Sequence, residues 1–204
     1  MSYWKNKVVV ITGAGSGIGR ALAREWAAKG ARLAMCDNNL DTLAQLAGEL
    51  EQGVGEPYVK VVDVAKELEM QTFAEQVYAH YGQVDVMVNN AGVAQTTTNV
   101  LQLSTEDFKW LMDINFWGMV YGSRAFLPYL RKQSQSHLAN VSSIFGMIAI
   151  PGLSSYNASK FAIRGFTEAL ILEERLAGTG VAVTSIHPGC VKRYFLRSAK
   201  VSDT

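Results

Sequence analysis

The stretch Thr12-Gly13-Ala14-Gly15-Ser16-Gly17-Ile18-Gly19 decides the fold of this chain, because it joins the apolar run 8–11 to the helix-forming segment 20–29. A helix N-terminus presents unpaired N–H groups and a partial positive charge that stabilise a phosphate, and glycines let the backbone approach such a ligand closely. The glycine spacing matches neither the G-x-G-x-x-G pattern nor the P-loop pattern. It predicts a phosphate-binding turn, and a purely structural tight turn is the alternative.

Outward from this turn, short β-branched runs alternate with segments of helical period along the whole chain. Strands are expected at 7–12, 31–36, 58–62, 84–88, 137–141 and 181–186. Helices are expected at 18–29, 40–50, 66–81, from about 104 to 130, and from 154 or 155 to about 177, with breaks at 53–57, at Gly82 and at 178–180. This rhythm predicts an α/β protein, a single doubly wound Rossmann-type domain over residues 1–204, with a parallel sheet of six or more strands and helices on both faces.

The bulk composition describes a globular protein of one domain. The chain has 204 residues, of which 49% are hydrophobic and 18% charged, and its formal net charge is +1. A balance so close to neutral does not indicate binding to nucleic acid or to an anionic membrane. No apolar stretch reaches the ~18 residues that span a bilayer. Two cysteines, no metal-ligand spacing and no export signal favour a reducing compartment, so we expect a cytoplasmic protein without a metal.

Asp37 ends the second predicted strand, eighteen positions after Gly19. In a dinucleotide-binding fold, an acid at this place accepts hydrogen bonds from the adenosine ribose and repels a 2′-phosphate. A cofactor with that phosphate calls for Arg or Lys nearby, whereas this chain has Asn38 and Ser16. The sequence therefore favours NAD over NADP, and the alternative is that Asp37 merely caps the next helix.

Tyr156 and Lys160 lie four positions apart on a predicted helix, so their side chains share one face. Tyrosine, with a reference pKa of about 10, is a poor base at neutral pH, and a neighbouring ammonium stabilises its phenolate. By itself the pair also fits the edge of an ordinary amphipathic helix. Ser143, after the fifth predicted strand, shifts the balance, because the carboxyl ends of parallel strands gather at one edge. Its hydroxyl is placed to bond a substrate oxygen while Tyr156 transfers the proton.

From about Lys5 to Val191 the chain resembles the classical short-chain dehydrogenase/reductase family. The resemblance rests on several motifs in the family's order, each weak or moderate alone. They are the turn 12–19, the pair Asp63-Val64, the run Asn89-Asn90-Ala91-Gly92, then Asn115, then Ser143 with Tyr156 thirteen positions on and Lys160, and finally Pro188-Gly189.

The resemblance implies a role for each matching residue. Tyr156 would be the general acid or base, Lys160 would lower its pKa and bind the nicotinamide ribose, Ser143 would polarise the substrate oxygen, and Asn115 would hold a water through its backbone. Asp63 would bond the adenine amino group. The implied cofactor-binding set is Gly13, Ser16, Gly17, Ile18, Gly19, Asp37, Asp63, Val64, Asn89, Gly92, Tyr156, Lys160, Pro188, Gly189 and Val191. Asn89 and Asn90 have a second interpretation, in which they tie strand ends together.

Two features depart from the family pattern. Position 193 holds Arg where the family has a Thr that binds the nicotinamide carboxamide, and no seventh strand or C-terminal substrate lobe is visible before Thr204. Three explanations stay open. The sequence is truncated, a segment around Lys192-Arg193 is missing from it, or the protein lacks the lobe; we favour the first two, because an exposed apolar sheet edge is avoided.

The apolar run 144–150 indicates a pocket for a hydrophobic secondary alcohol or ketone, with core packing as the alternative. Bulky side chains on more than one face of the helices 116–129 and from 156 onward, such as Phe116, Trp117 and Phe161, resemble family helices that pack against a twofold mate, so we expect a homodimer or homotetramer.

The sequence thus predicts an NAD-dependent oxidoreductase. The alternatives are an NADP-dependent carbonyl or 3-oxoacyl reductase of the same family, a nucleotide-binding protein without turnover, and a methyltransferase, which leaves the Ser143, Tyr156 and Lys160 spacing unexplained.

Overall fold

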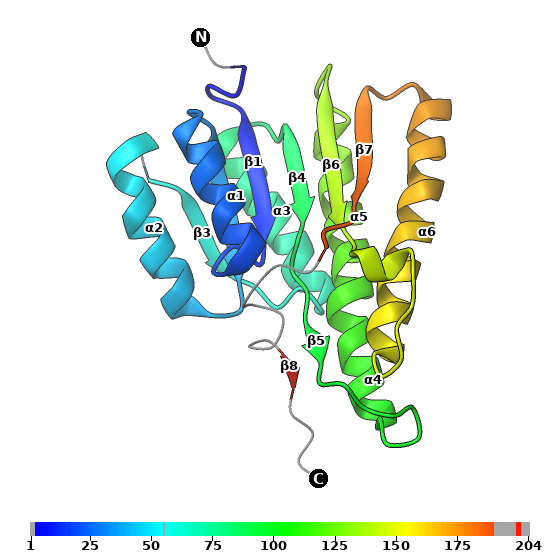
Figure 1. Ribbon diagram of the computed structural model, residues 1–204. Helices are drawn as coiled ribbons and strands as arrows, with labels where there is room; N and C mark the ends of the chain where they lie inside the picture. Colours follow the sequence, from blue (N-terminus) through cyan, green and yellow to red (C-terminus); the bar gives the residue numbers. More distant parts are fainter. Residues whose placement is uncertain (1–2, 55, 190–198, 201–204) are drawn as a thin grey trace.

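Six parallel strands form the central sheet of the computed structural model, which describes residues 3–54, 56–189 and 199–200 (Figure 1). The strands are β1 (Val8–Thr12), β2 (Arg32–Asp37), β3 (Tyr58–Val61), β4 (Val86–Asn89), β6 (Ser136–Val141) and β7 (Val181–Ile186). Their order across the sheet is β3-β2-β1-β4-β6-β7. The predicted α/β fold with a parallel sheet of six strands is therefore confirmed.

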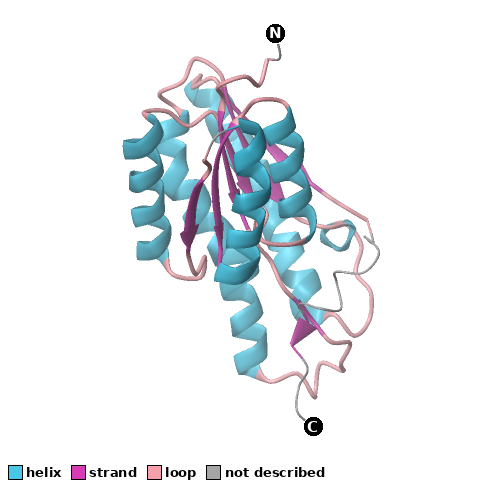
Figure 2. Ribbon diagram, turned by 90° about the vertical axis from the view of Figure 1, so that its left-hand side faces the viewer, coloured by secondary structure: helices cyan, strands magenta, loops and turns pink. Residues whose placement is uncertain are grey.

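Helices cover both faces of this sheet (Figures 1 and 2). They are α1 (Gly17–Ala28), α2 (Leu40–Val54), α3 (Glu67–Tyr81), α4 (Thr105–Met112), α5 (Gly118–Leu130) and α6 (Ser154–Ala177). Alternate residues of β1 point to opposite faces. Val9 and Ile11 pack with apolar residues of α1 and α2, while Val8 and Val10 join a cluster with residues of α3, α5 and α6. All five residues of β1 are buried, as expected for a strand covered on both faces.

The strand order reverses between β1 and β4, which creates the crevice at their carboxyl ends. From β1 the chain moves outward through β2 and β3, then returns to β4 and continues through β6 to β7 on the other side. Thr12 ends β1 and Asn89 ends β4, so the glycine turn and the Asn89-Asn90 run meet at this switch point.

Three local features differ from the expectation. Helix α2 continues through Val54, so Gly53 does not end it, because one glycine costs a helix only about 1 kcal/mol. The helix expected from about 104 to 130 is interrupted by a π-helical turn, Asp113–Trp117. A short two-stranded sheet, β5 (Ala94–Gln95) with β8 (Ala199–Lys200), was not predicted.

Helix ends elsewhere follow the predicted signals. Gly82 after α3 and Gly178 after α6 both adopt the left-handed conformation, with φ of 72° and 61°, which glycine tolerates without strain. Ser104 accepts a hydrogen bond from the backbone N–H of Asp107 at 3.0 Å and so caps α4.

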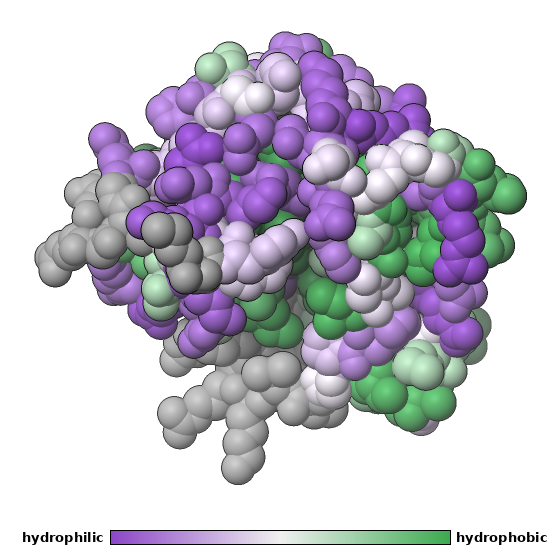
Figure 3. Space-filling view, turned by 90° about the horizontal axis from the view of Figure 1, so that it is seen from above, coloured by the Kyte–Doolittle hydropathy of each residue, from purple (hydrophilic) through white to green (hydrophobic). Residues whose placement is uncertain are grey.

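Hydrophilic residues cover much of the end of the molecule where the strands begin, the end opposite the crevice (Figure 3). Among the polar residues of this end, Asp85 is buried, and its carboxylate accepts hydrogen bonds from Lys7 Nζ, the backbone N–H of Val8 and Gln83 Nε2, each at 2.8 Å. This carboxylate joins the starts of β1 and β4.

The far ends of α5 and α6 are joined by a buried carboxylate. Glu174 of α6, whose side chain is 1% exposed, bonds the guanidinium of Arg131 at the end of α5, with Nε to Oε2 at 3.1 Å, and also accepts from the hydroxyl of Thr179. The Arg131 guanidinium is the main cause that holds the pKa of Glu174 below its ordinary value.

We predict that Glu174→Gln lowers the free energy of unfolding by about 1–3 kcal/mol at neutral pH, because it removes a buried charge-assisted pair. The matched control is Glu168→Gln, which breaks an exposed pair with Arg164 on the same helix and costs at most about 1 kcal/mol. Urea unfolding followed by circular dichroism measures both.

The same pair predicts the pH dependence. A carboxylate with a lowered pKa contributes stability above its ordinary pKa and loses it as pH falls through the lowered value. The stability gap between the unaltered protein and Glu174→Gln should therefore be largest near neutrality and shrink in acid. A gap that is absent at pH 7, or that stays constant down to pH 3, would contradict this account.

Candidate active site

The glycine turn forms an open cradle at the start of α1. Gly13 and Gly17 have φ of 64° and 52°, values that residues with a side chain rarely adopt. Ser16 is the residue before the first turn of α1, and its side chain accepts no capping hydrogen bond from the described backbone of that turn. The first N–H groups of α1 are thereby left for a ligand, as the sequence predicts.

Gly19 shapes this turn from behind. A Cβ at Gly19 would overlap the carbonyl oxygen of Gly13 and lie 2.6 Å from Asn90 Nδ2. Gly19 is not among the residues that line the cleft, and its lack of a Cβ lets α1 approach the turn. Its predicted contact with the cofactor stays a prediction.

Thr12 and Asn90 fasten the turn to the end of β4. The Thr12 hydroxyl oxygen accepts the backbone N–H groups of Asn90 and Ala91, each at 3.0 Å. In return, Asn90 Nδ2 donates to the carbonyl oxygens of Thr12 at 2.9 Å and Gly13 at 3.1 Å. Asn90 also lines the cleft, so it ties strand ends together and faces the ligand space at once.

The side chain of Asn89 is held inside the protein. Its side chain is 4% exposed and donates to Ser123 Oγ at 3.0 Å and to Asn140 Oδ1 at 2.8 Å. The Asn89 side chain thus points into the sheet and α5 rather than into the cleft, as in the interpretation that it ties strand ends together. Its predicted contact with the cofactor stays a prediction.

Asp37 faces the glycine turn. Its Oδ2 accepts the backbone N–H of Gly15 at 2.8 Å, and its Oδ1 accepts that of Asn39 at 3.0 Å. The residue whose side chain caps α2 is Asn39, whose Oδ1 accepts the N–H of Thr42 at 3.0 Å. Asp37 lines the cleft beside this cap, so the capping alternative for Asp37 is wrong.

Asp63 and Val64 form the next part of the rim, after β3. Asp63 Oδ1 accepts the N–H of Ala65 at 3.0 Å, which bends the chain toward the cleft. Val64 packs closely on α5, because a Cβ at Gly118 would come within 2.8 Å of the Val64 side chain. Both residues line the cleft, as predicted.

Tyr156 and Lys160 lie on α6 and are buried, with 7% and 4% exposure. Lys160 Nζ donates to the carbonyl oxygen of Val141 at 3.1 Å, and it lies 5.5 Å from the centre of the Tyr156 ring. Burial lowers the pKa of Lys160 to about 8. The structure thus brings the predicted pair together against the end of β6.

Ser143 stands in the short loop between β6 and a 3₁₀ turn, Ile144–Gly146. Its Oγ accepts the N–H of Phe145 at 3.2 Å, and the residue lines the same cleft as Tyr156 and Lys160. The loop is fixed to α6 by Ser142, whose hydroxyl donates to the Lys160 carbonyl at 2.8 Å. Ser143, Tyr156 and Lys160 therefore share one cleft.

Asn115 lies in the π-helical turn and is completely buried. Its Oδ1 accepts the N–H of Val93 at 2.7 Å, and its Nδ2 donates to the Val93 carbonyl at 2.9 Å and to Ser159 Oγ at 3.1 Å. The side chain does not line the cleft, and its predicted water-holding role, which uses the backbone, stays a prediction. A Cβ at Gly92 would lie 3.1 Å from Asn115 Oδ1 and 3.5 Å from Lys160 Nζ, so Gly92 separates the two.

One continuous cleft of about 630 Å³ runs along these residues. The predicted residues that line it are Gly13, Ser16, Gly17, Ile18, Asp37, Asp63, Val64, Gly92, Ser143, Tyr156, Lys160, Pro188 and Gly189. Val191, Cys190 and Arg193 lie outside the described residues.

Several lining residues were not predicted to bind the cofactor. They are Asn38, Asn39, Thr42, Val62, Asn90, Ala91, Val93, Ala94, Ile114, Val141, Ser142, Ile144 and Phe145. Most of them follow directly on a strand end, and this is the signal by which the sequence could have shown them, because the carboxyl ends of parallel strands meet at one edge.

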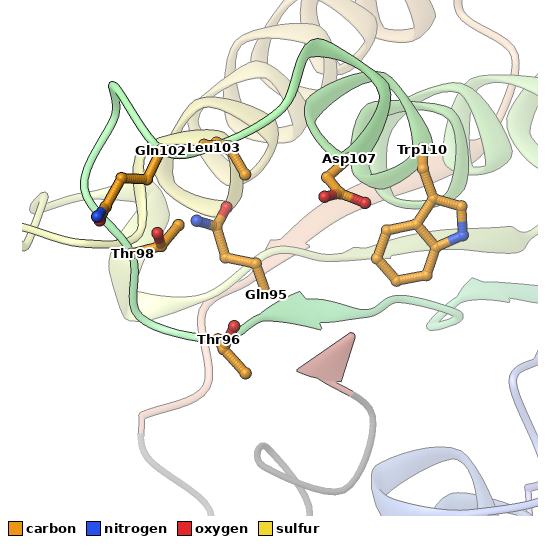
Figure 4. A pocket seen from close by; sticks show the side chains of 7 residues that line it. All are labelled: Gln95, Thr96, Thr98, Gln102, Leu103, Asp107 and Trp110. Atoms are coloured by element: carbon orange, nitrogen blue, oxygen red, sulfur yellow. The ribbon is translucent and has the colours of Figure 1, made fainter. Parts of the chain in front are cut away.

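A second, much smaller recess is lined by Gln95, the residue after the cleft residue Ala94, and by residues that follow it in the chain (Figure 4). Asp107 and Trp110 project from α4 toward Gln95 of β5, and the space between them is about 20 Å³. That volume accommodates about one water molecule, so a substrate belongs in the larger cleft.

Comparison with known proteins places these features in a family. The family model described as short chain dehydrogenase matches residues 7–202. The putative oxidoreductase SadH of Mycobacterium tuberculosis is 46% identical over 205 residues, which cover 100% of this chain and 73% of that protein. The chain belongs to the short-chain dehydrogenase family.

Similar solved structures agree with this membership. A short-chain dehydrogenase/reductase from Burkholderia phymatum in complex with NAD superposes with a TM-score of 0.93 at 32% identity, over 97% of this chain and 70% of that one. An alcohol dehydrogenase from the archaeon Thermococcus sibiricus complexed with 5-hydroxy-NADP gives 0.88 at 31% identity, over 97% and 82%. This short-chain dehydrogenase is accordingly an oxidoreductase that uses a nicotinamide cofactor and acts on small molecules.

A search of the described residues for a helix that could cross a membrane finds none.

We predict that Gly19→Ala weakens cofactor binding, because its methyl group cannot fit against the Gly13 carbonyl and must displace the turn. Overpacking of this kind costs the fold about 1–3 kcal/mol. A loss of about 1.4 kcal/mol in binding, as the displaced turn presents its N–H groups less well, raises the Kd for NADH about tenfold. Fluorescence titration with NADH measures it.

The matched control is Gly165→Ala on the exposed side of α6, where a Cβ meets no atom within 4 Å. It should stabilise the protein by about 0.5–1 kcal/mol and leave NADH affinity unchanged. An unchanged Kd in Gly19→Ala would show that the close approach does not shape the binding turn.

Proposed function

We propose that this chain transfers a hydride between NAD(H) and a hydrophobic secondary alcohol or its ketone, with Tyr156 as the acid or base. The observation that carries the proposal is the convergence of Ser143, Tyr156 and Lys160 in one cleft with the glycine turn. The parallel sheet brings the segment 143–160, which carries these three residues, to the glycine turn 12–19 far away in the sequence. Their chemistry matches proton transfer at a carbinol oxygen.

The residues of the cleft fit a dinucleotide. The uncapped start of α1 would hold the pyrophosphate, Asp37 the adenosine ribose, Asp63 and Val64 the adenine, and Lys160 the nicotinamide ribose. When bound, the nicotinamide supplies the hydride acceptor or donor. The chain itself supplies binding, orientation and the proton.

Proton transfer is assigned to Tyr156, with Ser143 beside it. In alcohol oxidation the phenolate oxygen accepts the hydroxyl proton of the substrate while the C–H electron pair leaves as hydride, and in ketone reduction both steps run in reverse. The Ser143 hydroxyl donates a hydrogen bond to the substrate oxygen and so stabilises the charge that develops there.

Lys160 supports this chemistry with its charge. Its pKa of about 8 leaves it mostly an ammonium at neutral pH, in spite of its burial. A buried positive charge close to a phenol favours the phenolate, because the surroundings screen it less than water does.

NAD is the proposed cofactor in preference to NADP. The carboxylate of Asp37 faces the turn at the end of β2, where a 2′-phosphate would meet a negative charge. The cleft residues that follow it, Asn38 and Asn39, carry no positive charge. NADP-dependent carbonyl reduction is the alternative, and the Thermococcus alcohol dehydrogenase bound to 5-hydroxy-NADP shows that a similar fold accepts such a ligand.

The substrate end of the cleft favours an apolar molecule. Val93, Ala94, Ile144 and Phe145 line it, and Lys160 is the one charged side chain among the described lining residues other than the two aspartates of the adenosine end. Further apolar side chains follow on the exposed stretch 147–150. A carboxylate or phosphate on the substrate would find no dedicated partner there among the described residues.

A homodimer or homotetramer is the proposed assembly. Trp117 before α5 and Phe161 on α6 are 42% and 41% exposed, and Trp117 stacks on Tyr121 with ring centres 5.8 Å apart. Large exposed aromatic side chains on neighbouring helices are typical of an interface between copies.

The first test is Tyr156→Phe, which removes one oxygen and keeps the ring. We expect kcat to fall by roughly 10²- to 10⁴-fold, which is the usual contribution of general acid–base catalysis, since no other phenol lines the described cleft. NAD reduction by a panel of secondary alcohols and NADH oxidation by the matching ketones measure it. The Kd for NADH should stay within about threefold.

Tyr121→Phe is the control, because this phenol lies on α5 outside the cleft. If Tyr156→Phe turned over the substrate as fast as the unaltered protein does, the catalytic role of Tyr156 would be refuted. Tight NADH binding with no turnover of any panel member would favour a binding protein instead.

The second test is Asp37→Asn, which removes the charge and keeps the shape. Loss of a charge-assisted bond worth about 1.5 kcal/mol should raise the Kd for NAD about tenfold, while the Kd for NADP falls or stays, because the repulsion is gone. Asp41→Asn, an exposed acid in the first turn of α2, is the control with no expected change. Tighter binding of NADP than NAD by the unaltered protein would overturn the preference.

A further inference from the structure

His187 lies between β7 and the cleft residue Pro188, and its ring bonds at both nitrogens. Nδ1 is 3.0 Å from the carbonyl oxygen of Ser143, and Nε2 is 2.9 Å from Ser185 Oγ. From the sequence alone, this histidine fits an ordinary packing residue. Its contact with the main chain of Ser143, a proposed catalytic residue, indicates a role beyond packing.

The chemistry of the partners determines the tautomer. A carbonyl oxygen only accepts, so Nδ1 carries the hydrogen and donates it to Ser143. In the neutral ring, Nε2 then accepts from the Ser185 hydroxyl. In the protonated ring, Nε2 donates to the Ser185 oxygen instead, and the bond to Ser143 persists. The contact with Ser143 is therefore present in both protonation states.

The bond from His187 is half of a clamp on one peptide unit. The Ser143 carbonyl and the Ile144 N–H belong to the same peptide plane. The carbonyl accepts from His187, and the N–H donates to the Pro188 carbonyl at 2.9 Å. Both polar groups of this peptide are thus held by consecutive residues after β7. Rotation of the plane, which would turn the Ser143 side chain, breaks both bonds together.

We propose that His187 is a positioning residue that holds Ser143 in the orientation needed for catalysis. This inference rests on the proposed function of Ser143. Both ring nitrogens of His187 are engaged with the protein, so it acts through the main chain of Ser143 and not by proton transfer to the substrate. Small displacements of a group that orients a reacting oxygen cost rate rather than cofactor affinity.

His137 offers a matched comparison on the same pair of strands. Its Nε2 lies 2.8 Å from Thr184 Oγ1, so it also links β6 to β7, but its bond does not reach the loop of Ser143. A purely structural link between the strands would make the two histidines equivalent in turnover.

The experiment exploits the two ring positions. Asn carries its amide nitrogen on Cγ, as Nδ1 is carried, so His187→Asn keeps a donor for Ser143. Gln places its nitrogen one bond further, so His187→Gln loses it. We expect His187→Gln to lower kcat about tenfold or more, and His187→Asn to stay within about threefold of the unaltered protein. The probe is the fastest secondary alcohol of the panel with NAD, and the control His137→Asn should keep its kcat.

Two further measurements separate this role from damage to the fold. The Kd for NADH should be unchanged in His187→Gln, and any fall in Tm should be matched by His137→Asn. In a double-mutant cycle, His187→Gln should have no further effect on kcat once Ser143→Ala has removed the hydroxyl that it positions.

The outcomes distinguish the inference from the proposed function. Full activity in Ser143→Ala refutes the proposed function and the inference with it. An inactive Ser143→Ala with a fully active His187→Gln refutes the inference alone. Equal losses in the Asn and Gln variants, or additive losses in the cycle, likewise show that His187 does not act through its bond to Ser143.

Discussion

The buried ammonium of Lys160 is the constraint around which the cleft is built. A charge taken out of water needs a polar partner, and here the carbonyl of Val141 at the end of β6 accepts its hydrogen at 3.1 Å. The bond ties the last residue of a central strand to the start of α6. Tyr156 lies one helical turn earlier, and so its place relative to the end of β6, and to Ser143 two residues further, follows from where the lysine is anchored.

Side chains at the strand ends then fix the backbone of the neighbouring strand. Thr12 and Asn90 bond each other's main chain across β1 and β4. Ser142 bonds the main chain of α6, and His187 bonds that of Ser143. These links join the strand-end loops that carry the cleft residues, so that the proposed catalytic groups are held before a ligand arrives. Such preorganisation is what a proton-transferring site requires.

Local patterns predicted most of this architecture and most of the cleft, because strand ends, glycine turns and helical spacing are written in neighbouring residues. What they missed depends on contacts between distant segments. The direction of the Asn89 side chain, for which the sequence left two interpretations open, illustrates this. Asn89 is still within β4 and shares a face with Met87, which packs against helices, so its side chain turns away from the cleft while Asn90, after the strand, enters it. The burial of Asn115 in the π-helical turn was missed for a similar reason, since its side chain bonds Val93 and Ser159, which belong to other segments.

The distribution of charge along the cleft also favours one direction for the cofactor. Asp37 and Asp63 lie at the end formed by β2 and β3, and Lys160 lies at the end formed by β6 and α6. Carboxylates suit hydroxyl and amino donors such as those of an adenosine, whereas an ammonium suits ribose oxygens and a developing phenolate. A dinucleotide laid the other way would place its adenosine against the ammonium and its reactive ring far from Ser143 and Tyr156. With the cofactor bound as proposed, the same order of strands that creates the crevice would also bring the reactive end of the cofactor to the end of the cleft that holds Ser143 and Tyr156.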